Sequence, residues 1–132
     1  MFSIDGLDHV AIRVKDIDLS CEWYARVLGL KRYDVEAWGP FPVFMLSGQS
    51  GVAIFPSDGQ SLEAYPRALR IDHFAFRVDS KAFREAQAHF KALGIDFIFQ
   101  DHIHFHSVYL KDPDGHTVEL TTLIGEAKDF YK

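Results

Sequence analysis

The segment Asp8-His9-Val10-Ala11-Ile12-Arg13-Val14 returns, almost letter for letter, as Asp72-His73-Phe74-Ala75-Phe76-Arg77-Val78. Two further stretches recur about 65 residues apart: Leu28-Gly29-Leu30 as Leu93-Gly94-Ile95, and Val52-Ala53-Ile54 as Val118-Glu119-Leu120. Because the copies keep their order, the chain reads as one supersecondary unit written twice. Each copy places a histidine on its first strand, and one copy places a glutamate on its last.

The repeat predicts an α+β fold of two β-α-β-β-β modules within one domain, residues 1–132. Module one spans about 7–56, a polar linker about 57–70, module two about 71–122, and a C-terminal helix or tail 123–132. We expect the two sheets to curve into a half-barrel or a shared barrel. In module one, Asp16 or Asp18 can cap a helix that runs to Leu28 and stops at Gly29. In module two, Ser80 can cap the equivalent helix, which runs to Leu93.

The amino-acid composition limits the kinds of partner and the location that we expect for this protein. The net charge is −5 and both signs are interspersed, which argues against nucleic acid and against an anionic membrane surface. No apolar run approaches the ~20 residues that span a bilayer. A single cysteine, Cys21, excludes an internal disulfide and favours a cytoplasmic location.

Strand parity predicts a site. Alternation puts Val10, Ile12 and Val14 on the packed face of the first strand, so His9 points the other way. By the same rule His73 and Glu119 point away from the helix of module two. Two imidazoles and one carboxylate on such faces match a facial triad that binds a divalent ion, here Fe, Mn, Zn or Ni. Alternatively, a histidine that follows an aspartate at the start of a strand is a hydrogen-bonded structural residue.

The paired Asp-His-x-Ala strands and the ending Tyr109-x-x-Asp112-Pro113-Asp114-Gly115-His116-x-x-Glu119 resemble the vicinal oxygen chelate superfamily. This superfamily includes glyoxalase lyases, fosfomycin resistance proteins, extradiol dioxygenases and bleomycin resistance proteins. The resemblance covers about Leu7 to Thr122 and implies that His9, His73 and Glu119 hold a metal that binds adjacent substrate oxygens. It also implies a homodimer, in which the two subunits can exchange modules.

Some residues that particular enzymes of this superfamily use are missing from the sequence, which disfavours their reactions. The glyoxalase lyases and the fosfomycin epoxide hydrolases use a module-one carboxylate, but Ala53 stands at its place and no Asp or Glu lies between Ala37 and Ser57. A fosfomycin-type thiol transferase keeps the three ligands, although Ala11 replaces its usual threonine. An extradiol dioxygenase also uses three ligands, with a tyrosine ten residues before the glutamate, as Tyr109 is. We therefore slightly favour a dioxygenase-like enzyme; a metal-free, ligand-sequestering protein of the bleomycin resistance type is the alternative outside enzymes.

Other residues could complete the site. His102, His104 and His106 alternate before Tyr109, and His106 is the best candidate for an acid-base catalyst, although regular strand parity would turn it away from Tyr109. Arg13 and Arg77 share the face of the histidines and either hold an anionic substrate or reach into water. The many aromatic residues favour a small apolar or aromatic substrate over a sugar or nucleotide.

Overall fold

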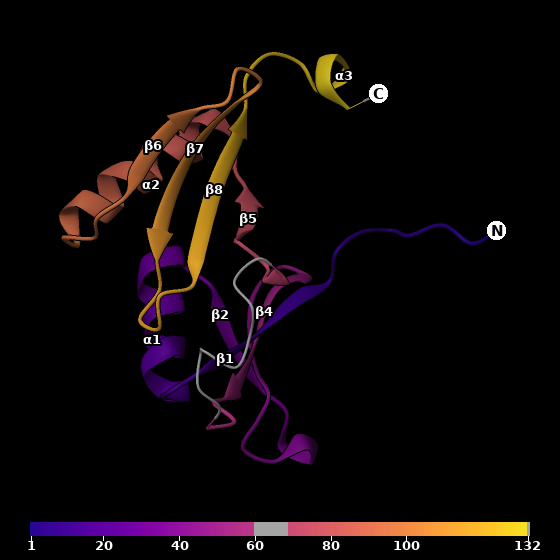
Figure 1. The fold of residues 1–132 in the computed structure, drawn as a ribbon, viewed down its shortest axis with the longest axis vertical. Helices are drawn as coiled ribbons and strands as arrows, with labels where there is room; N and C mark the ends of the chain where they lie inside the picture. The colour runs from indigo at the N-terminus through magenta and orange to yellow at the C-terminus, as the bar shows by residue number, and fades with distance from the viewer. Residues whose placement is uncertain (60–68, 132) are drawn as a thin grey trace. The chain divides into compact units, whose positions relative to one another are not determined.

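A computed structural model describes residues 1–59 and 69–131. The chain forms two compact units, one on each side of residues 60–68, and each is described here as a module by itself. Most of the expected linker therefore lies outside the described residues. Figure 1 shows the elements of both modules.

Module one has the predicted β-α-β-β-β order (Figure 1). Its sheet runs β1-β4-β3-β2, with β1 parallel to β4 and the other neighbours antiparallel. A short 3-10 helix follows β2. The elements are β1 (His9–Val14), α1 (Ile17–Leu28), β2 (Lys31–Asp34), the 3-10 helix (Glu36–Trp38), β3 (Val43–Ser47) and β4 (Ser50–Pro56).

Module two repeats this plan, with sheet order β5-β8-β7-β6 and β5 parallel to β8. A short C-terminal helix follows, as expected. The elements are β5 (Phe74–Arg77), α2 (Ser80–Ala92), β6 (Ile98–Asp101), β7 (Phe105–Lys111), β8 (Thr117–Leu123) and α3 (Ala127–Phe130). The α+β prediction and the twofold repeat are confirmed.

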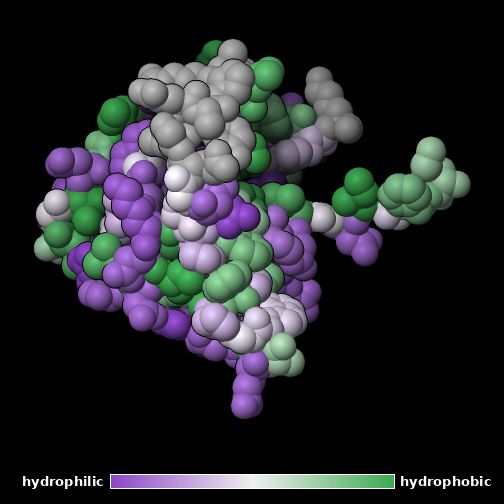
Figure 2. Space-filling view, turned by 60° about the horizontal axis from the view of Figure 1, so that its bottom comes forward, coloured by the Kyte–Doolittle hydropathy of each residue, from purple (hydrophilic) through white to green (hydrophobic). Residues whose placement is uncertain are grey.

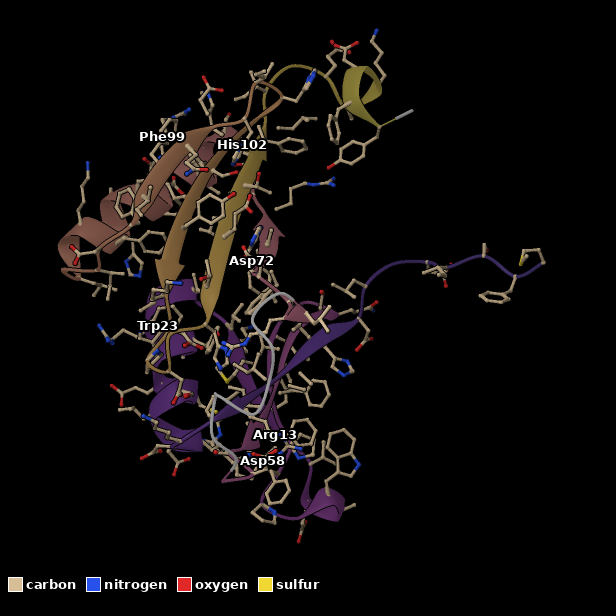
Figure 3. The ribbon with its side chains drawn as sticks, in the orientation of Figure 1. Arg13, Trp23, Asp58, Asp72, Phe99 and His102 are labelled. Atoms are coloured by element: carbon tan, nitrogen blue, oxygen red, sulfur yellow. The ribbon has the colours of Figure 1, made fainter. Side chains whose placement is uncertain are left out.

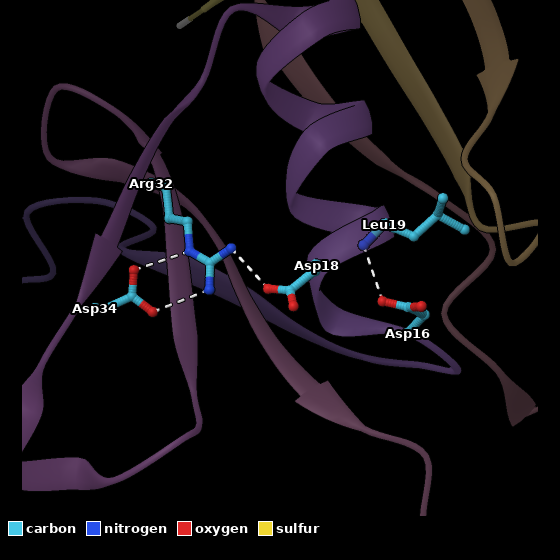
Figure 4. A network of polar contacts seen from close by, with 5 residues as sticks. All are labelled: Asp16, Asp18, Leu19, Arg32 and Asp34. Carbon is cyan, nitrogen blue, oxygen red and sulfur yellow. Dashed lines mark hydrogen bonds and ion pairs between the residues drawn. The ribbon is translucent and has the colours of Figure 1, made fainter.

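The helix ends show why these segments form helices. Asp16 caps α1, since its carboxylate accepts a hydrogen bond from the Leu19 amide at 2.9 Å (Figure 4). Gly29 ends α1 in the left-handed region, at φ 69°, which a residue without Cβ adopts at little cost. The expected cap of α2 was wrong by one residue. Asp79 is the cap, its carboxylate accepting from the Ala82 amide at 2.7 Å, and Ser80 is already helical.

One face of each sheet packs against its own helix. In module one the buried strand residues include Val14, Met45 and Ile54, and Tyr24 and Val27 of α1 are buried as well. In module two the corresponding residues are Val108, Val118 and Leu120, with Phe83 and Phe90 from α2. Burial in β1 alternates as the sequence predicted, with Ile12 and Val14 buried and His9, Ala11 and Arg13 exposed. The opposite faces are therefore available for function, and we call the one in module two the site face.

Gly51 shows how closely the backbones of module one approach. A Cβ atom at this position would lie 2.1 Å from the carbonyl oxygen of Met45. Gly51 also donates its amide to the Asp8 carbonyl at 3.2 Å, directly beside His9. Only glycine allows β4 to pass β3 here and still support the start of β1.

The surface carries apolar residues as well as charges (Figure 2). The N-terminal segment before β1 extends away from module one and exposes Met1, Phe2, Ile4 and Leu7 (Figures 1 and 2). In the described part of the chain, no helix has the length and apolar character needed to cross a membrane.

Candidate metal centre

The strand register shows which positions of the two modules correspond. In module two, Ala75 lies beside Glu119 on the neighbouring parallel strand, and Tyr109 lies opposite Glu119 on the antiparallel one. In module one the same pairings join Ala11 to Ala53 and Phe44 to Ala53. Ala53 is thus the counterpart of Glu119, and Phe44 is the counterpart of Tyr109. At these corresponding positions module two has polar side chains and module one has apolar ones.

His73 and Glu119 meet on the site face. His73 precedes β5, and its Nε2 lies 3.0 Å from Oε1 of Glu119 in the centre of β8. The other ring nitrogen, Nδ1, lies 2.6 Å from the carboxylate of Asp72, which Figure 3 labels near the start of β5. Glu119 is buried at 7% residue exposure, whereas the His73 side chain is 34% exposed, so the carboxylate is shielded from water and the imidazole is reached by it.

A neutral His73 ring cannot donate a hydrogen bond to both carboxylates. A neutral imidazole has one N–H donor, and in the tautomer protonated at Nδ1 the Asp72 carboxylate accepts that hydrogen bond. Nε2 then faces a second carboxylate with only a lone pair, so the contact with Glu119 requires either a second proton or a cation between the two atoms. A carboxylate that orients a histidine through its far nitrogen is also the usual support of a metal-binding imidazole.

The second oxygen of Glu119 is held from β7. Ser107 donates its hydroxyl to Oε2 of Glu119 at 2.8 Å and lies 3.0 Å from the hydroxyl of Thr121. Ser107 is itself fully buried. The carboxylate is therefore fixed by one hydroxyl while Oε1 remains directed at His73. This residue could not be found from the sequence by its type, but strand parity places Ser107, Tyr109, Glu119 and Thr121 on one face.

Tyr109 completes this cluster. Its ring contacts the His73 ring edge-on, with centroids 5.4 Å apart. Burial, followed by hydrogen bonding to Glu119 and the negative charge there, raises the pKa of Tyr109 above its ordinary value. The phenol therefore keeps its proton at neutral pH, in contact with the buried carboxylate.

The histidine beside Tyr109 is His102, not His106. Nε2 of His102 lies 3.0 Å from the Tyr109 hydroxyl, and the hairpin between β6 and β7 brings it there (Figure 3). β7 is regular from Phe105, so His106 lies on the helix-facing side, 3.8 Å from Asp101 and edge-on to Phe99. The structure thus brings Tyr109 to the predicted site and leaves His106 on the opposite side of the strand.

A strained turn holds His102 in place. Ile103 has a φ of 71°, a left-handed conformation in which a β-branched residue is a genuine outlier. Such a residue costs on the order of 1–3 kcal/mol and persists only where neighbouring contacts fix it. Here the Ile103 amide donates to the Asp101 carboxylate at 2.8 Å, and the His102 amide donates to the Phe105 carbonyl at 2.8 Å. Sequence parity could not reveal this, because isoleucine gives no turn signal.

His9 has a similar but less polar environment in module one. Its Nδ1 lies 2.7 Å from the Asp8 carboxylate, repeating the His73–Asp72 contact, and its ring packs edge-on against Phe44 at 5.1 Å. Nε2 of His9 has no hydrogen-bond partner among the described residues of its module. Within either module, the described residues form no group of three or more His, Cys, Asp or Glu side chains placed to hold a metal.

Comparisons with known proteins agree with the fold. Residues 6–120 match the family model of the Glyoxalase/Bleomycin resistance protein/Dioxygenase superfamily. A lactoylglutathione lyase of Pseudomonas putida is 30% identical over 86% of this chain and 82% of that protein. The metallothiol transferase FosB of Staphylococcus epidermidis is 23% identical over 98% and 90%, respectively. The crystal structure of a lactoylglutathione lyase from Agrobacterium tumefaciens is 25% identical, covers 98% of both chains and superposes with a TM-score of 0.72.

Proposed function

The chain belongs to the Glyoxalase/Bleomycin resistance protein/Dioxygenase superfamily, and we propose that within it the chain is a divalent-metal-dependent enzyme acting on a small oxygenated substrate. The observation that carries this proposal is the placement of His73 between two carboxylates, with buried Glu119 facing its Nε2 at 3.0 Å. A cation there would satisfy both atoms at once.

The donor set fits such an ion. Histidine nitrogens and carboxylate oxygens bind first-row divalent metals at about 2.0–2.2 Å. Nε2 of His73 and Oε1 of Glu119 lie 3.0 Å apart, so both atoms could contact one ion. In our proposal His9 supplies the third ligand through Nε2, since its Nδ1 lies against the Asp8 carboxylate. When bound, the ion would act as a Lewis acid toward adjacent substrate oxygens.

The reaction that we favour is dioxygenase-like. Ala53, at the place of Glu119 in module one, can neither bind a metal nor take a proton, which argues against a lyase despite the similarity to lactoylglutathione lyases. Three ligands leave coordination positions open for a substrate and dioxygen. The chain's own polar groups for substrate protons are the Tyr109 phenol and His102 behind it, joined at 3.0 Å.

Thiol transfer is the second candidate. The similarity to the metallothiol transferase FosB extends over 98% of this chain and favours it. Ala11, on the exposed side of β1, lacks the hydroxyl that this type of enzyme typically has there. A metal-free binding protein is less well supported. Burying a carboxylate such as Glu119 costs free energy unless a cation or hydrogen-bond donors compensate its charge.

Exposed aromatic side chains support an aromatic or otherwise apolar substrate. Trp38 is 50% exposed and Phe41 42% exposed, and both lie in ring contacts with strand residues: Trp38 with Phe44, and Phe41 with Phe55. A depression of about 410 Å³ in module two is lined by residues 94–98, 109–111 and 117, so it includes Tyr109 but neither His73 nor Glu119. Aromatic walls with a few directed polar groups are typical of small-molecule sites.

We further propose a cytoplasmic homodimer. Cys21 is buried and burial raises the pKa of its thiol, which suits a protein kept in its reduced state. The strands that begin with the repeated motif, β1 and β5, are edge strands of their sheets, and edge strands are readily paired with another chain. Module exchange between subunits would let His9 of one subunit join His73 and Glu119 of its partner.

The test is metal loading followed by two substrate panels. Protein purified without chelator is loaded anaerobically with Fe²⁺ and offered a series of catechols with dioxygen, and in parallel fosfomycin with a thiol. We expect oxygen uptake with ring cleavage of at least one catechol. Turnover in the thiol panel alone would replace our favoured reaction with the second candidate, and failure to retain any divalent ion would contradict the metalloenzyme itself.

A further inference from the structure

Arg77 lies on the same face as the candidate metal centre. It is the last residue of β5 and sits in register with Thr121, two residues beyond the Ala75–Glu119 pair. Two residues of a strand span about 7 Å. A cationic group therefore ends the polar row that runs from Glu119 through Ser107 and Thr121.

Within residues 1–59 and 69–131, no carboxylate forms an ion pair with Arg77. Among the described residues its contacts are a hydrogen bond donated to the Tyr131 hydroxyl at 2.7 Å and the face of the Tyr131 ring, 4.9 Å from the guanidinium carbon. Arg32 shows the opposite arrangement (Figure 4): it binds Asp34 through two nitrogens, at 2.8 and 3.1 Å, and Asp18 at 2.9 Å. A guanidinium has five N–H donors, and the Tyr131 hydroxyl is the one acceptor that those of Arg77 have in the described part of the chain.

Tyr131 is held in place by aromatic packing. Phe130, the last residue of α3, packs edge-on against Phe105 at 4.7 Å and against Tyr131 at 5.0 Å. Phe105 begins β7 on the same side of the strand as Tyr109. The C-terminal segment is therefore fixed at the end of the site face, where its phenol orients Arg77.

We infer that Arg77 and Tyr131 form a subsite for a carboxylate group of the substrate. One guanidinium balances the single negative charge of a carboxylate, and its planar fork matches the two oxygens. A substrate with adjacent oxygens at one end and a carboxylate at the other would then lie along the row from Glu119 to Arg77. This inference rests on the proposed function, because it assigns the far end of the same substrate.

The test compares two diols that differ only in the carboxylate. Catechol and 3,4-dihydroxybenzoate are titrated calorimetrically into protein loaded anaerobically with Mn²⁺. We expect 3,4-dihydroxybenzoate to bind about tenfold more tightly, as one charge-assisted contact allows. Arg77→Gln should remove this preference, and Tyr131→Ala should reduce it to about threefold. The control is Arg84→Gln, on the exposed side of α2, which makes the same charge change. It should keep the preference for 3,4-dihydroxybenzoate.

The outcomes separate the two proposals. Equal affinities of both diols for the wild-type protein, or a full preference in Arg77→Gln, would overturn the subsite while leaving the metal centre standing. An equal loss in Arg84→Gln would also overturn it, since the preference would then come from overall charge. If neither diol binds the metal-loaded protein, the result contradicts both the proposed function and the carboxylate subsite.

Discussion

At the scale of single residues, strand parity predicted that His9, His73 and Glu119 point away from the helices, because alternation along a strand is enforced by backbone geometry. The family resemblance added Tyr109, and His102 was not singled out. The structure brings three of them together in module two, and His9 as a ligand stays a prediction. His102 was missed because its position depends on a left-handed Ile103, which parity cannot describe.

The pairing of His102 with Tyr109 predicts a kinetic effect. His102→Phe should lower kcat on the catechol substrate by about tenfold, since one hydrogen bond that orients the phenol is lost. The metal content should stay at the wild-type level, because His102 contacts Tyr109 and not the candidate ligands. Steady-state kinetics with metal analysis would measure both.

His104 and His106 provide matched controls for this variant. Both can be changed to phenylalanine within the same short segment, and neither contacts Tyr109: His104 packs on Phe130, and His106 on Phe99. We expect each to retain kcat within about twofold. A loss in His106→Phe equal to that in His102→Phe would restore His106 as the acid-base residue and contradict this assignment.

At the scale of elements, the repeat predicted the β-α-β-β-β order of both modules, whereas the 3-10 helix Glu36–Trp38 was not predicted. Gly29 and Gly94 end the helical regions as expected, because both adopt positive φ. The cap of α2 differed because Asp79 and Ser80 are both good caps, and only the direction of the chain before the helix decides between them.

The corrected cap makes a stability prediction. Asp79→Ala should lower the free energy of unfolding by about 1 kcal/mol, since the Ala82 amide loses its acceptor. Ser80→Ala, inside the first turn, should change it by less than about 0.5 kcal/mol. Urea denaturation of both variants measures the difference. A larger loss from Ser80→Ala would show that the serine is the cap after all.

The contact that joins β2 to α1 predicts a dependence on pH. Hydrogen bonds from Arg32 hold the pKa of Asp34 below its ordinary value. Their stabilising effect is therefore complete above the ordinary carboxyl pKa of about 3.9 and is lost as the pH falls through the lower, folded value. We expect Asp34→Asn to lower the urea midpoint at neutral pH and to converge with wild type in strong acid.

Exposed Asp96 on module two serves as the control for this experiment. Asp96→Asn makes the same chemical change without removing an ion pair to Arg32. It should therefore leave the urea midpoint near that of wild type at each pH. A gap between wild type and Asp34→Asn that stays constant into acid would contradict the role of the carboxylate charge.

At the scale of the whole molecule, the internal repeat predicted two equivalent modules because duplicated hydrophobic patterns must form duplicated cores. It could not predict whether modules pair within one chain or across two, since that choice depends on the chain between them more than on either sheet. The polar side chains of the candidate site are also distributed unequally between the modules. Module one has His9 beside Phe44, and module two has the buried carboxylate of Glu119.

Mixed dimers distinguish the two arrangements. His9→Ala and Glu119→Ala subunits are refolded together, and the heterodimer is isolated by different affinity tags. In an exchanged dimer, one site would combine His9 of the Glu119→Ala subunit with His73 and Glu119 of the His9→Ala subunit, so one intact site is restored. Without exchange both sites stay defective. We expect the mixed dimer to bind one divalent ion, whereas each mutant homodimer binds none.

The measurement that tests the central claim most directly is the metal content per chain after loading with Mn²⁺ and removal of free ions. The account predicts about one ion per chain in the wild type, none in His9→Ala, His73→Ala or Glu119→Ala, and a wild-type value in Glu85→Ala, which removes an exposed carboxylate of α2. A wild-type protein that binds no stoichiometric ion, or a Glu119→Ala variant that binds it as well as the wild type, would contradict the account.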